Sequence, residues 1–186
     1  MEKISVEKLM LSKEVKLDKC PMEHLDELVA VSREAYIDNY RHIWTDSGAN
    51  YLEKNFTKSV LAKDFSDANI FYFFVSKNDE NIGFVKLHLD LAVENYASVD
   101  SIYLERLYLK KAYCGRGIGA EVMRKLFEFS EKHAKKVMWL RAMPSTPTVK
   151  FYERLGFRTV AEGKIPFPFI KTEHSPLFTM VKNLQN

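Results

Sequence analysis

Three glycines, Gly115, Gly117 and Gly119, fall within five residues, between a segment with strand character and a segment with helical spacing. Glycines at such a junction let the backbone approach a ligand closely, and several N–H groups are free to point at it. The positive end of the dipole of the following helix also favours negative charge there. The arrangement therefore predicts an anion site, and a phosphate is the first candidate.

Charged residues are distributed unevenly around these glycines. The 186-residue chain has a formal net charge of +3. Residues 110–158 contain twelve of its 28 Lys and Arg residues and four of its 25 Asp and Glu residues, and the rest of the chain carries a net charge of −5. A basic half suits a polyanionic ligand, and an acidic remainder suits a cationic one. An accident of composition would produce the same asymmetry, and this alternative stays open.

Composition limits the class of protein. Hydrophobic residues make up 46% and charged residues 28%, as in ordinary globular proteins. The longest apolar run, 70–75, is far shorter than the ~20 residues of a membrane-spanning helix, and the charged N-terminal sequence has no signal-peptide core. Cys20, Cys114 and the five histidines show no disulfide framework or metal-ligand spacing. We therefore expect a reduced, cytoplasmic protein with no metal and with neither membrane nor nucleic acid as a partner.

Hydrophobic periodicity predicts the elements that position the glycines. A strand over about 101–110 precedes them, and a helix begins at Ile118 with Val122, Leu126 and Phe129 on one stripe. The other expected elements are helices at 21–40, about 50–63 and 147–155, and strands at 14–19, 70–76, 82–91, 136–142, 158–162 and about 177–183. This order predicts an α+β fold, a single-layer mixed β-sheet of about seven strands flanked by about four helices, in one domain over residues 1–186.

The run from Gly115 to Ala120 also fits the dinucleotide-binding pattern G-x-G-x-x-G/A, which is weak on its own. Only 67 residues follow Gly119, too few for a doubly wound sheet. The preceding strand carries Glu105 and Arg106, whereas a buried parallel strand is nearly all apolar. Arg141, and no acid, ends the next strand, which disfavours a ribose contact. A Walker A motif is excluded because no Gly-Lys-Ser/Thr follows.

Two motifs together resemble the GNAT superfamily of N-acetyltransferases. The cofactor motif of that family, Gln/Arg-x-x-Gly-x-Gly/Ala, is matched at Gly117 and Gly119, and its signature Phe-Tyr-x-x-x-Gly-Phe is intact from Phe151 to Phe157. The resemblance covers about residues 14–184. It implies the GNAT fold and acetyl-CoA as co-substrate. The run LERLYLKKAYCGRGIG is most similar to the bacterial branch that acetylates polyamines such as spermidine and spermine.

The resemblance also implies which residues bind acetyl-CoA. The N–H groups of Gly115–Ala120 would hold the pyrophosphate with Arg116 as charged partner, and the main chain of Leu107–Leu109 would pair with the pantetheine arm. The N–H of Leu109 would also stabilise an oxyanion. Lys150 and Arg154 would face the 3′-phosphate, unless they only form a solvated helix face. The expected cofactor-binding residues are Leu107, Tyr108, Leu109, Cys114, Gly115, Arg116, Gly117, Ile118, Gly119, Ala120, Ser145, Lys150 and Arg154.

Two of these positions depart from the family pattern. Cys114 stands where the family usually has Gln or Arg, which removes a side-chain contact but leaves the backbone N–H groups. Ser145 stands where many relatives have an Asn that contacts the cofactor. Cys114 also lies near Lys110, Lys111 and Arg116 at a helix N-terminus, so a depressed pKa is one expectation and a simple replacement of Gln is the other.

The expected reaction needs a base for the ammonium group and an acid for the departing thiolate. Glu105 is the expected base, directly or through water, because it lies on the central strand two residues before the cofactor-pairing segment. A surface carboxylate paired with Arg106 is the alternative. Tyr152 is the expected acid, because it matches the family's Tyr, and a core aromatic beside Phe151 is the alternative.

The acceptor side is expected between Asp18 and Lys63 and in the loop 90–100. These segments contain aromatic residues, of which Tyr36, Tyr40 and Trp44 are the predicted substrate contacts. They also contain acidic residues, namely Asp38, Asp46, Glu53, Asp90, Glu94 and Asp100. Acidic and aromatic walls suit a cationic amine. A solvated acidic surface over an aromatic core is the alternative.

The expected function is transfer of the acetyl group of acetyl-CoA to a small primary amine, a polyamine or similar cationic amine, by direct attack in a ternary complex. Acetylation of a protein N-terminus or lysine is an alternative, which an open acceptor groove would favour over a closed pocket. A non-catalytic acetyl-CoA sensor is a third hypothesis, against which Glu105 and Tyr152 argue. A homodimer is expected from the family alone.

Overall fold

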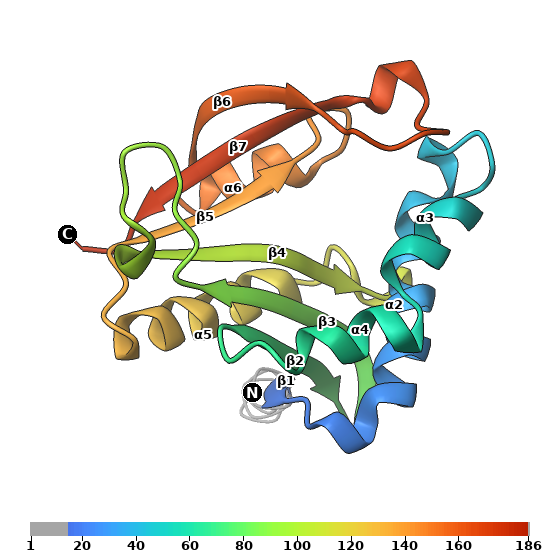
Figure 1. The fold of residues 1–186 in the computed structure, drawn as a ribbon, viewed down its shortest axis with the longest axis horizontal. Helices are drawn as coiled ribbons and strands as arrows, with labels where there is room; N and C mark the ends of the chain where they lie inside the picture. Colours follow the sequence, from blue (N-terminus) through green and yellow to red (C-terminus); the bar gives the residue numbers. More distant parts are fainter. Residues whose placement is uncertain (1–14, 186) are drawn as a thin grey trace, which may run out of the picture.

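The computed structural model describes residues 15–185, which form one seven-stranded sheet with helices on both faces (Figure 1). The sheet order is β1-β2-β3-β4-β5-β7-β6, and every neighbouring pair is antiparallel except β4–β5. The strands are β1 (Val15–Lys19), β2 (Ile70–Lys77), β3 (Glu80–Leu89), β4 (Ser101–Leu109), β5 (Val137–Ala142), β6 (Arg158–Lys164) and β7 (Pro176–Asn183). The predicted mixed sheet of about seven strands is confirmed. The expectations for residues 1–14 lie outside the described residues.

Helices cover the two faces of the sheet unequally (Figure 1). The helices are α2 (Leu25–Tyr40), α3 (Ala49–Asn55), α4 (Lys58–Asp64), α5 (Ile118–Lys132) and α6 (Thr148–Arg154). The apolar stripe of α5 packs with α6 against one face, and α2, α3 and α4 pack against the other face over β2–β4. Within residues 15–185 no helix combines the length and the apolar character needed to cross a membrane.

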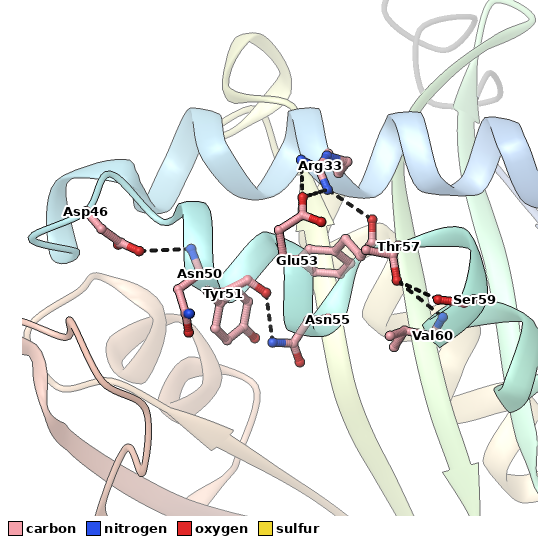
Figure 2. A network of polar contacts seen from close by, with 10 residues as sticks. Arg33, Asp46, Asn50, Tyr51, Glu53, Asn55, Thr57, Ser59 and Val60 are labelled. Atoms are coloured by element: carbon pink, nitrogen blue, oxygen red, sulfur yellow. Dashed lines mark hydrogen bonds and ion pairs between the residues drawn. The ribbon is translucent and has the colours of Figure 1, made fainter.

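The single helix expected over about 50–63 is wrong, because the chain forms two helices, α3 and α4. Thr57 lies between them in an extended conformation, and its hydroxyl accepts a hydrogen bond from the N–H of Val60 (Figure 2). A threonine that caps in this way begins a new helix. The break leaves the ring of Phe56 fully buried against the sheet.

A β-bulge interrupts β4 at Glu105. In the register with β3, Arg106 lies opposite Lys86 and Leu104 lies opposite Leu87, so Glu105 is the extra residue. Leu104 belongs to the core on the α5 side, whereas Arg106 contacts α3 on the other side. The bulge therefore places Glu105 and Arg106 together on the face that α2–α4 only partly cover.

The parallel strands β4 and β5 separate beyond this bulge. Their pairing ends at Leu104 and Leu140, although β4 continues to Leu109 and β5 to Ala142 (Figure 1). Leu107–Leu109 therefore do not pair with β5. Main-chain groups at this end of β4 are free of β5 and are available to an added strand-like ligand.

Replacement of Gly83 by alanine is expected to push the end of β4 away from β3. A Cβ at Gly83 would lie 2.3 Å from the carbonyl oxygen of Tyr108, which is backbone and cannot rotate away. We expect a loss of about 1–3 kcal/mol in the free energy of unfolding. Denaturant unfolding measures this loss.

The matched control is Gly163→Ala on β6. There a Cβ would meet only the carbonyl oxygen of Leu177, at 3.9 Å, so the stability should change by less than about 0.5 kcal/mol. If the two variants are equally stable, the close approach of β3 to Tyr108 does not constrain the sheet.

Candidate active site

Two cavities meet where β4 leaves β5. The glycine-turn cavity, of about 620 Å³, lies between the end of β4, the glycine turn before α5, and α6. The aromatic cavity, of about 410 Å³, lies between α2, α3, β4, β5 and residues 165–167. Both cavities are lined by Tyr40, Leu107, Tyr108, Thr148 and Tyr152. A ligand in one cavity can therefore reach a ligand in the other.

The glycine-turn cavity brings together most of the residues expected to bind the cofactor. Ten of the thirteen line it, namely Leu107, Tyr108, Leu109, Cys114, Gly115, Gly117, Gly119, Ala120, Ser145 and Arg154. Ile118, Arg116 and Lys150 are not among its lining residues. Ile118, the first residue of α5, is buried in the core. Arg116 is exposed in the glycine turn, and Lys150 is exposed on α6.

The glycine turn has the geometry of an anion site. Gly115 and Gly117 have φ angles of +72° and +81°, a left-handed conformation that favours glycine, and Gly117 caps the fifteen-residue helix α5. No atom lies within 4 Å of the place that a Cβ would occupy at either residue, so the space before the helix is open. A phosphate group fits this space and the helix N-terminus favours its charge.

Sequence reasoning missed Asn39 and His42 as residues of this cavity. The amide Nδ2 of Asn39 donates to the carbonyl oxygen of Leu109 at 2.7 Å and to that of Ala35 at 2.8 Å. It therefore ties the last residue of β4 to α2. No sequence pattern marks Asn39, because its partner on β4 is 70 residues away along the chain.

The aromatic cavity contains all three predicted substrate contacts, Tyr36, Tyr40 and Trp44. The ring of Tyr36 stacks on Tyr40 and Tyr51, with centroids 5.1 and 4.5 Å apart, and the indole N–H of Trp44 donates to its hydroxyl at 2.9 Å. Burial raises the pKa of the Tyr36 hydroxyl, so it stays neutral at physiological pH. Six tyrosines and Thr148 line this cavity, so its walls combine aromatic faces with hydroxyl groups.

A loop that sequence reasoning did not predict roofs the aromatic cavity. The segment after β6 pairs with residues 43–45: Trp44 forms a bridge with Ile170, and the N–H of Lys171 donates to the carbonyl oxygen of Ile43 at 2.9 Å. Ile165, Pro166 and Phe167 of this segment line the cavity. The aromatic cavity is therefore a roofed pocket, and the two segments that pair over it are more than 120 residues apart.

The expected acidic wall is wrong. Asp46 caps α3 by accepting from the N–H of Asn50 at 2.8 Å, and Glu53 pairs with Arg33 at 3.1 Å (Figure 2). The other four acids also lie outside the aromatic cavity, where Asp38 accepts from the N–H of Lys111, Asp90 pairs with Lys135, Asp100 pairs with Lys136, and Glu94 lines a separate surface hollow. Among residues 15–185, three charged residues line the cavity, and these are Glu105, Arg106 and Arg141.

Glu105 is held in a network of cations. Its carboxylate lies 2.9 Å from the ammonium nitrogen of Lys86 and 3.0 Å from Arg106 Nη2, and it accepts a short hydrogen bond from His88. Lys86 is itself 2.8 Å from Asp64. Burial alone would raise the pKa of Glu105, but the His88 hydrogen bond and the two cations outweigh burial and lower it to about 2. Glu105 is therefore ionised, and it is no solvated surface carboxylate.

Tyr152 lies where the two cavities join. It is on α6, only 8% exposed, and lines both cavities. Its ring packs against Phe151 and Phe157, as a core aromatic would, and the residue also lines both cavities, where a ligand can contact it. Burial raises the pKa of the phenol well above its ordinary value. The hydroxyl is therefore protonated at physiological pH and is able to donate.

Residues 32–157 match the sequence profile of the Acetyltransferase (GNAT) family. The chain belongs to this family. It is therefore an acetyltransferase that uses acetyl-CoA, and the order of its strands and helices is the GNAT fold. The glycine-turn cavity fits the phosphates of the co-substrate because its backbone is open at Gly115 and Gly117.

Known proteins share this fold at low identity. An uncharacterized N-acetyltransferase of Lactobacillus delbrueckii subsp. lactis is 29% identical over 154 residues, which are 80% of this chain and 87% of that protein. The PaiA N-acetyltransferase of Thermoplasma acidophilum, solved with coenzyme A, is 22% identical with a TM-score of 0.71, over 91% of this chain and 98% of that one. The spermidine/spermine N-acetyltransferase SpeG of Vibrio cholerae is 16% identical with a TM-score of 0.65, over 94% and 95%.

The two departures from the GNAT pattern lie in the glycine-turn cavity. Ser145 accepts or donates a hydrogen bond with His174 at 2.9 Å. The thiol of Cys114 lies 3.7 Å from Asn39 Oδ1 and from the carbonyl oxygen of Leu109. Burial and the nearby Asp38 raise the pKa of Cys114, so the expectation of a depressed pKa is wrong. Lys111 lowers the pKa too little to offset these two effects.

Alkylation of Cys114 is expected to be slow and to be blocked by acetyl-CoA. Cys114 is exposed and its raised pKa leaves little thiolate at pH 7.5, whereas Cys20 is buried with its pKa raised to about 12. Iodoacetamide should therefore add one group per chain, more slowly than to free cysteine. Intact mass measures the rate, and Cys114→Ser should remain unmodified. The blocking ligand in the assay is acetyl-CoA, which has no free thiol to consume iodoacetamide. Equal rates with and without saturating acetyl-CoA would argue against a thiol beside the co-substrate.

Proposed function

We propose that this GNAT enzyme transfers the acetyl group of acetyl-CoA to the primary amine of a small molecule in the aromatic cavity. Attack is direct, in a ternary complex. The observation that carries the proposal is the junction of the glycine-turn cavity with a roofed aromatic cavity at Leu107, Tyr108 and Tyr152. A roofed pocket favours a small acceptor over a protein N-terminus, which needs an open groove.

The backbone and α6 supply most of the site that we propose. Acetyl-CoA, when bound, supplies an activated thioester. The N–H groups of Gly115–Ala120 bind its pyrophosphate, and the main chain of Leu107–Leu109 pairs with its pantetheine arm. The N–H of Leu109 stabilises negative charge that develops on the thioester oxygen. The hydroxyl of Tyr152 donates a proton to the departing sulfur and regains it from solvent.

Glu105 acts through water in this proposal. An alkylammonium with a pKa near ~10 would have to give its proton to a carboxylate with a pKa of about 2. At ~1.4 kcal/mol per pKa unit, that transfer is uphill by roughly 11 kcal/mol. The carboxylate instead orients a water that passes the proton to solvent, while its negative charge attracts the ammonium group into place.

A polyamine is one candidate for the acceptor. The aromatic faces support it, because a cation over an aromatic ring is stabilised by about 0.5–2 kcal/mol. The likeness in fold to a spermidine/spermine acetyltransferase leads to the same candidate. The charge of the cavity does not add support, because its one carboxylate, Glu105, is already shared among Lys86, His88 and Arg106.

The test is release of free coenzyme A thiol from acetyl-CoA across a panel of acceptors. The panel contains spermidine, cadaverine, tyramine, amino acids and peptides, and the acetylated product is identified by mass. We expect release with small amines and little with peptides of six or more residues. Efficient release only with peptides would favour a protein acetyltransferase. No release with any acceptor, despite measurable acetyl-CoA binding, would favour a sensor.

A further inference from the structure

Arg141 is a cation of the aromatic cavity without a counter-ion. It is the first residue of β5 after the last pair with β4, so it lies at the gap opposite the Glu105 bulge. Arg141 is exposed at the cavity wall, no salt bridge among residues 15–185 includes it, and its guanidinium carbon lies 5.8 Å from the centre of the Trp139 ring. An arginine that lines a pocket and has no acidic partner is available to a ligand.

A second guanidinium in the same wall is only partly neutralised. Arg106 is 7% exposed, and its Nη2 bonds to Glu105 and to Asn55 Oδ1, at 3.0 and 2.9 Å. Its Nη1 is buried and has no hydrogen-bond partner in residues 15–185. The lining charges are thus two guanidinium groups and one carboxylate. An acceptor with a second ammonium group would add positive charge beside Arg141, which opposes its binding.

We infer that the acceptor amine carries a carboxylate within a few bonds of its nitrogen, as an amino acid does, and that Arg141 binds this carboxylate. The inference rests on the proposed function and narrows its substrate class. A planar guanidinium can form two parallel hydrogen bonds to a carboxylate. The nitrogen must reach the gap between β4 and β5, where Arg141 lies, so the carboxylate has to be close to the nitrogen. The remainder of the acceptor lies among the aromatic rings.

Two matched pairs of acceptors test this inference. Tyramine and tyrosine differ only by the carboxylate, as do cadaverine and lysine. With the unmodified enzyme we expect kcat/KM to be at least tenfold higher for the carboxylated member of at least one pair. In Arg141→Gln that ratio should fall at least tenfold, mainly through the KM for the amino acid. Arg141→Lys, which keeps the charge but not the planar group, should restore part of the ratio.

The matched control removes the same charge outside the cavity. Arg158 is exposed on β6 and lines a different surface hollow, so Arg158→Gln should leave the ratio unchanged. An unchanged KM for acetyl-CoA in Arg141→Gln shows that the variant is folded.

Three outcomes would overturn the inference. The first is a higher kcat/KM for tyramine, cadaverine or spermidine than for the amino acids. The second is an equal loss of kcat/KM for both members of a pair in Arg141→Gln. Either result leaves the proposed amine acetylation standing. No thiol release with any amine would overturn the proposed function and this inference together.

Discussion

Tyr152→Phe is expected to lower kcat about 100-fold or more and to change the KM for acetyl-CoA less than about threefold. Loss of a general acid costs ~10²–10⁴ in rate, and each tenfold corresponds to about 1.4 kcal/mol in the barrier. The phenylalanine ring keeps the contacts that Tyr152 makes with Phe151 and Phe157. Only the hydroxyl group at the junction of the two cavities, which we propose as the proton donor, is removed.

Steady-state kinetics at saturating amine, together with direct titration of acetyl-CoA, separate the two effects. Because burial raises the pKa of Tyr152, the hydroxyl should remain protonated through the neutral pH range and the wild-type rate should not fall there. Tyr96→Phe is the control, since its hydroxyl bonds to Asn183 Oδ1 outside both cavities and its loss should leave kcat within about twofold. An unchanged kcat in Tyr152→Phe would remove Tyr152 from the mechanism.

Glu105→Gln is expected to lower both stability and activity. The folded protein holds the pKa of Glu105 at about 2, below its ordinary value of 4.5. A depressed carboxyl pKa contributes stability that is fully present above pH 4.5 and is lost as the pH falls toward 2. The shift corresponds to about 3 kcal/mol at neutral pH. The variant also leaves Lys86 and Arg106 without their shared anion, and its kcat should fall at least tenfold.

Urea unfolding at pH 7 and at pH 3 measures the pH dependence. The difference in stability between wild type and Glu105→Gln should be about 3 kcal/mol at pH 7 and clearly smaller at pH 3. Glu53→Gln is the control, because Glu53 pairs with Arg33 on the surface and is 66% exposed. Its loss should cost less than about 1 kcal/mol. A difference for Glu105→Gln that is the same at both pH values would show that the network does not depress this pKa.

Local patterns were sufficient for the elements that hold the co-substrate. The positive φ angles of Gly115 and Gly117 follow from glycines placed directly before an amphipathic helix, and α5 begins at Ile118 as expected. The end of α6 just before Gly156, whose φ is +88°, also follows from neighbouring residues in the sequence. In each case neighbouring residues alone impose the backbone conformation, so the sequence by itself determined the glycine turn, the start of α5 and the end of α6.

Contacts between distant segments determine the lining and the charge of the aromatic cavity. These contacts could not be predicted from the sequence. Glu105 and Arg106 share a face only because a bulge shifts the register against β3, although the three-residue spacing of Leu104 and Leu107 was a sign of it. The expected acidic wall failed because distant basic and backbone groups engage Asp46, Glu53 and the other acids. Ion pairing depends on which side chains meet in space, and the composition of a segment does not predict these meetings.

The sequence by itself therefore determined the GNAT fold and the glycine turn before α5, and it led to Tyr152 and Glu105 as the residues to test. Only the tertiary structure decided that residues 165–167 cover the aromatic cavity, that Lys86, Arg106 and a hydrogen bond with His88 hold Glu105 ionised, and that Arg141 forms no salt bridge among the described residues. The physical reason is the separation along the chain of the residues that determine each property. Backbone conformation and amphipathic spacing are set within about ten residues, whereas the charge of a pocket is the sum of groups that only folding brings together.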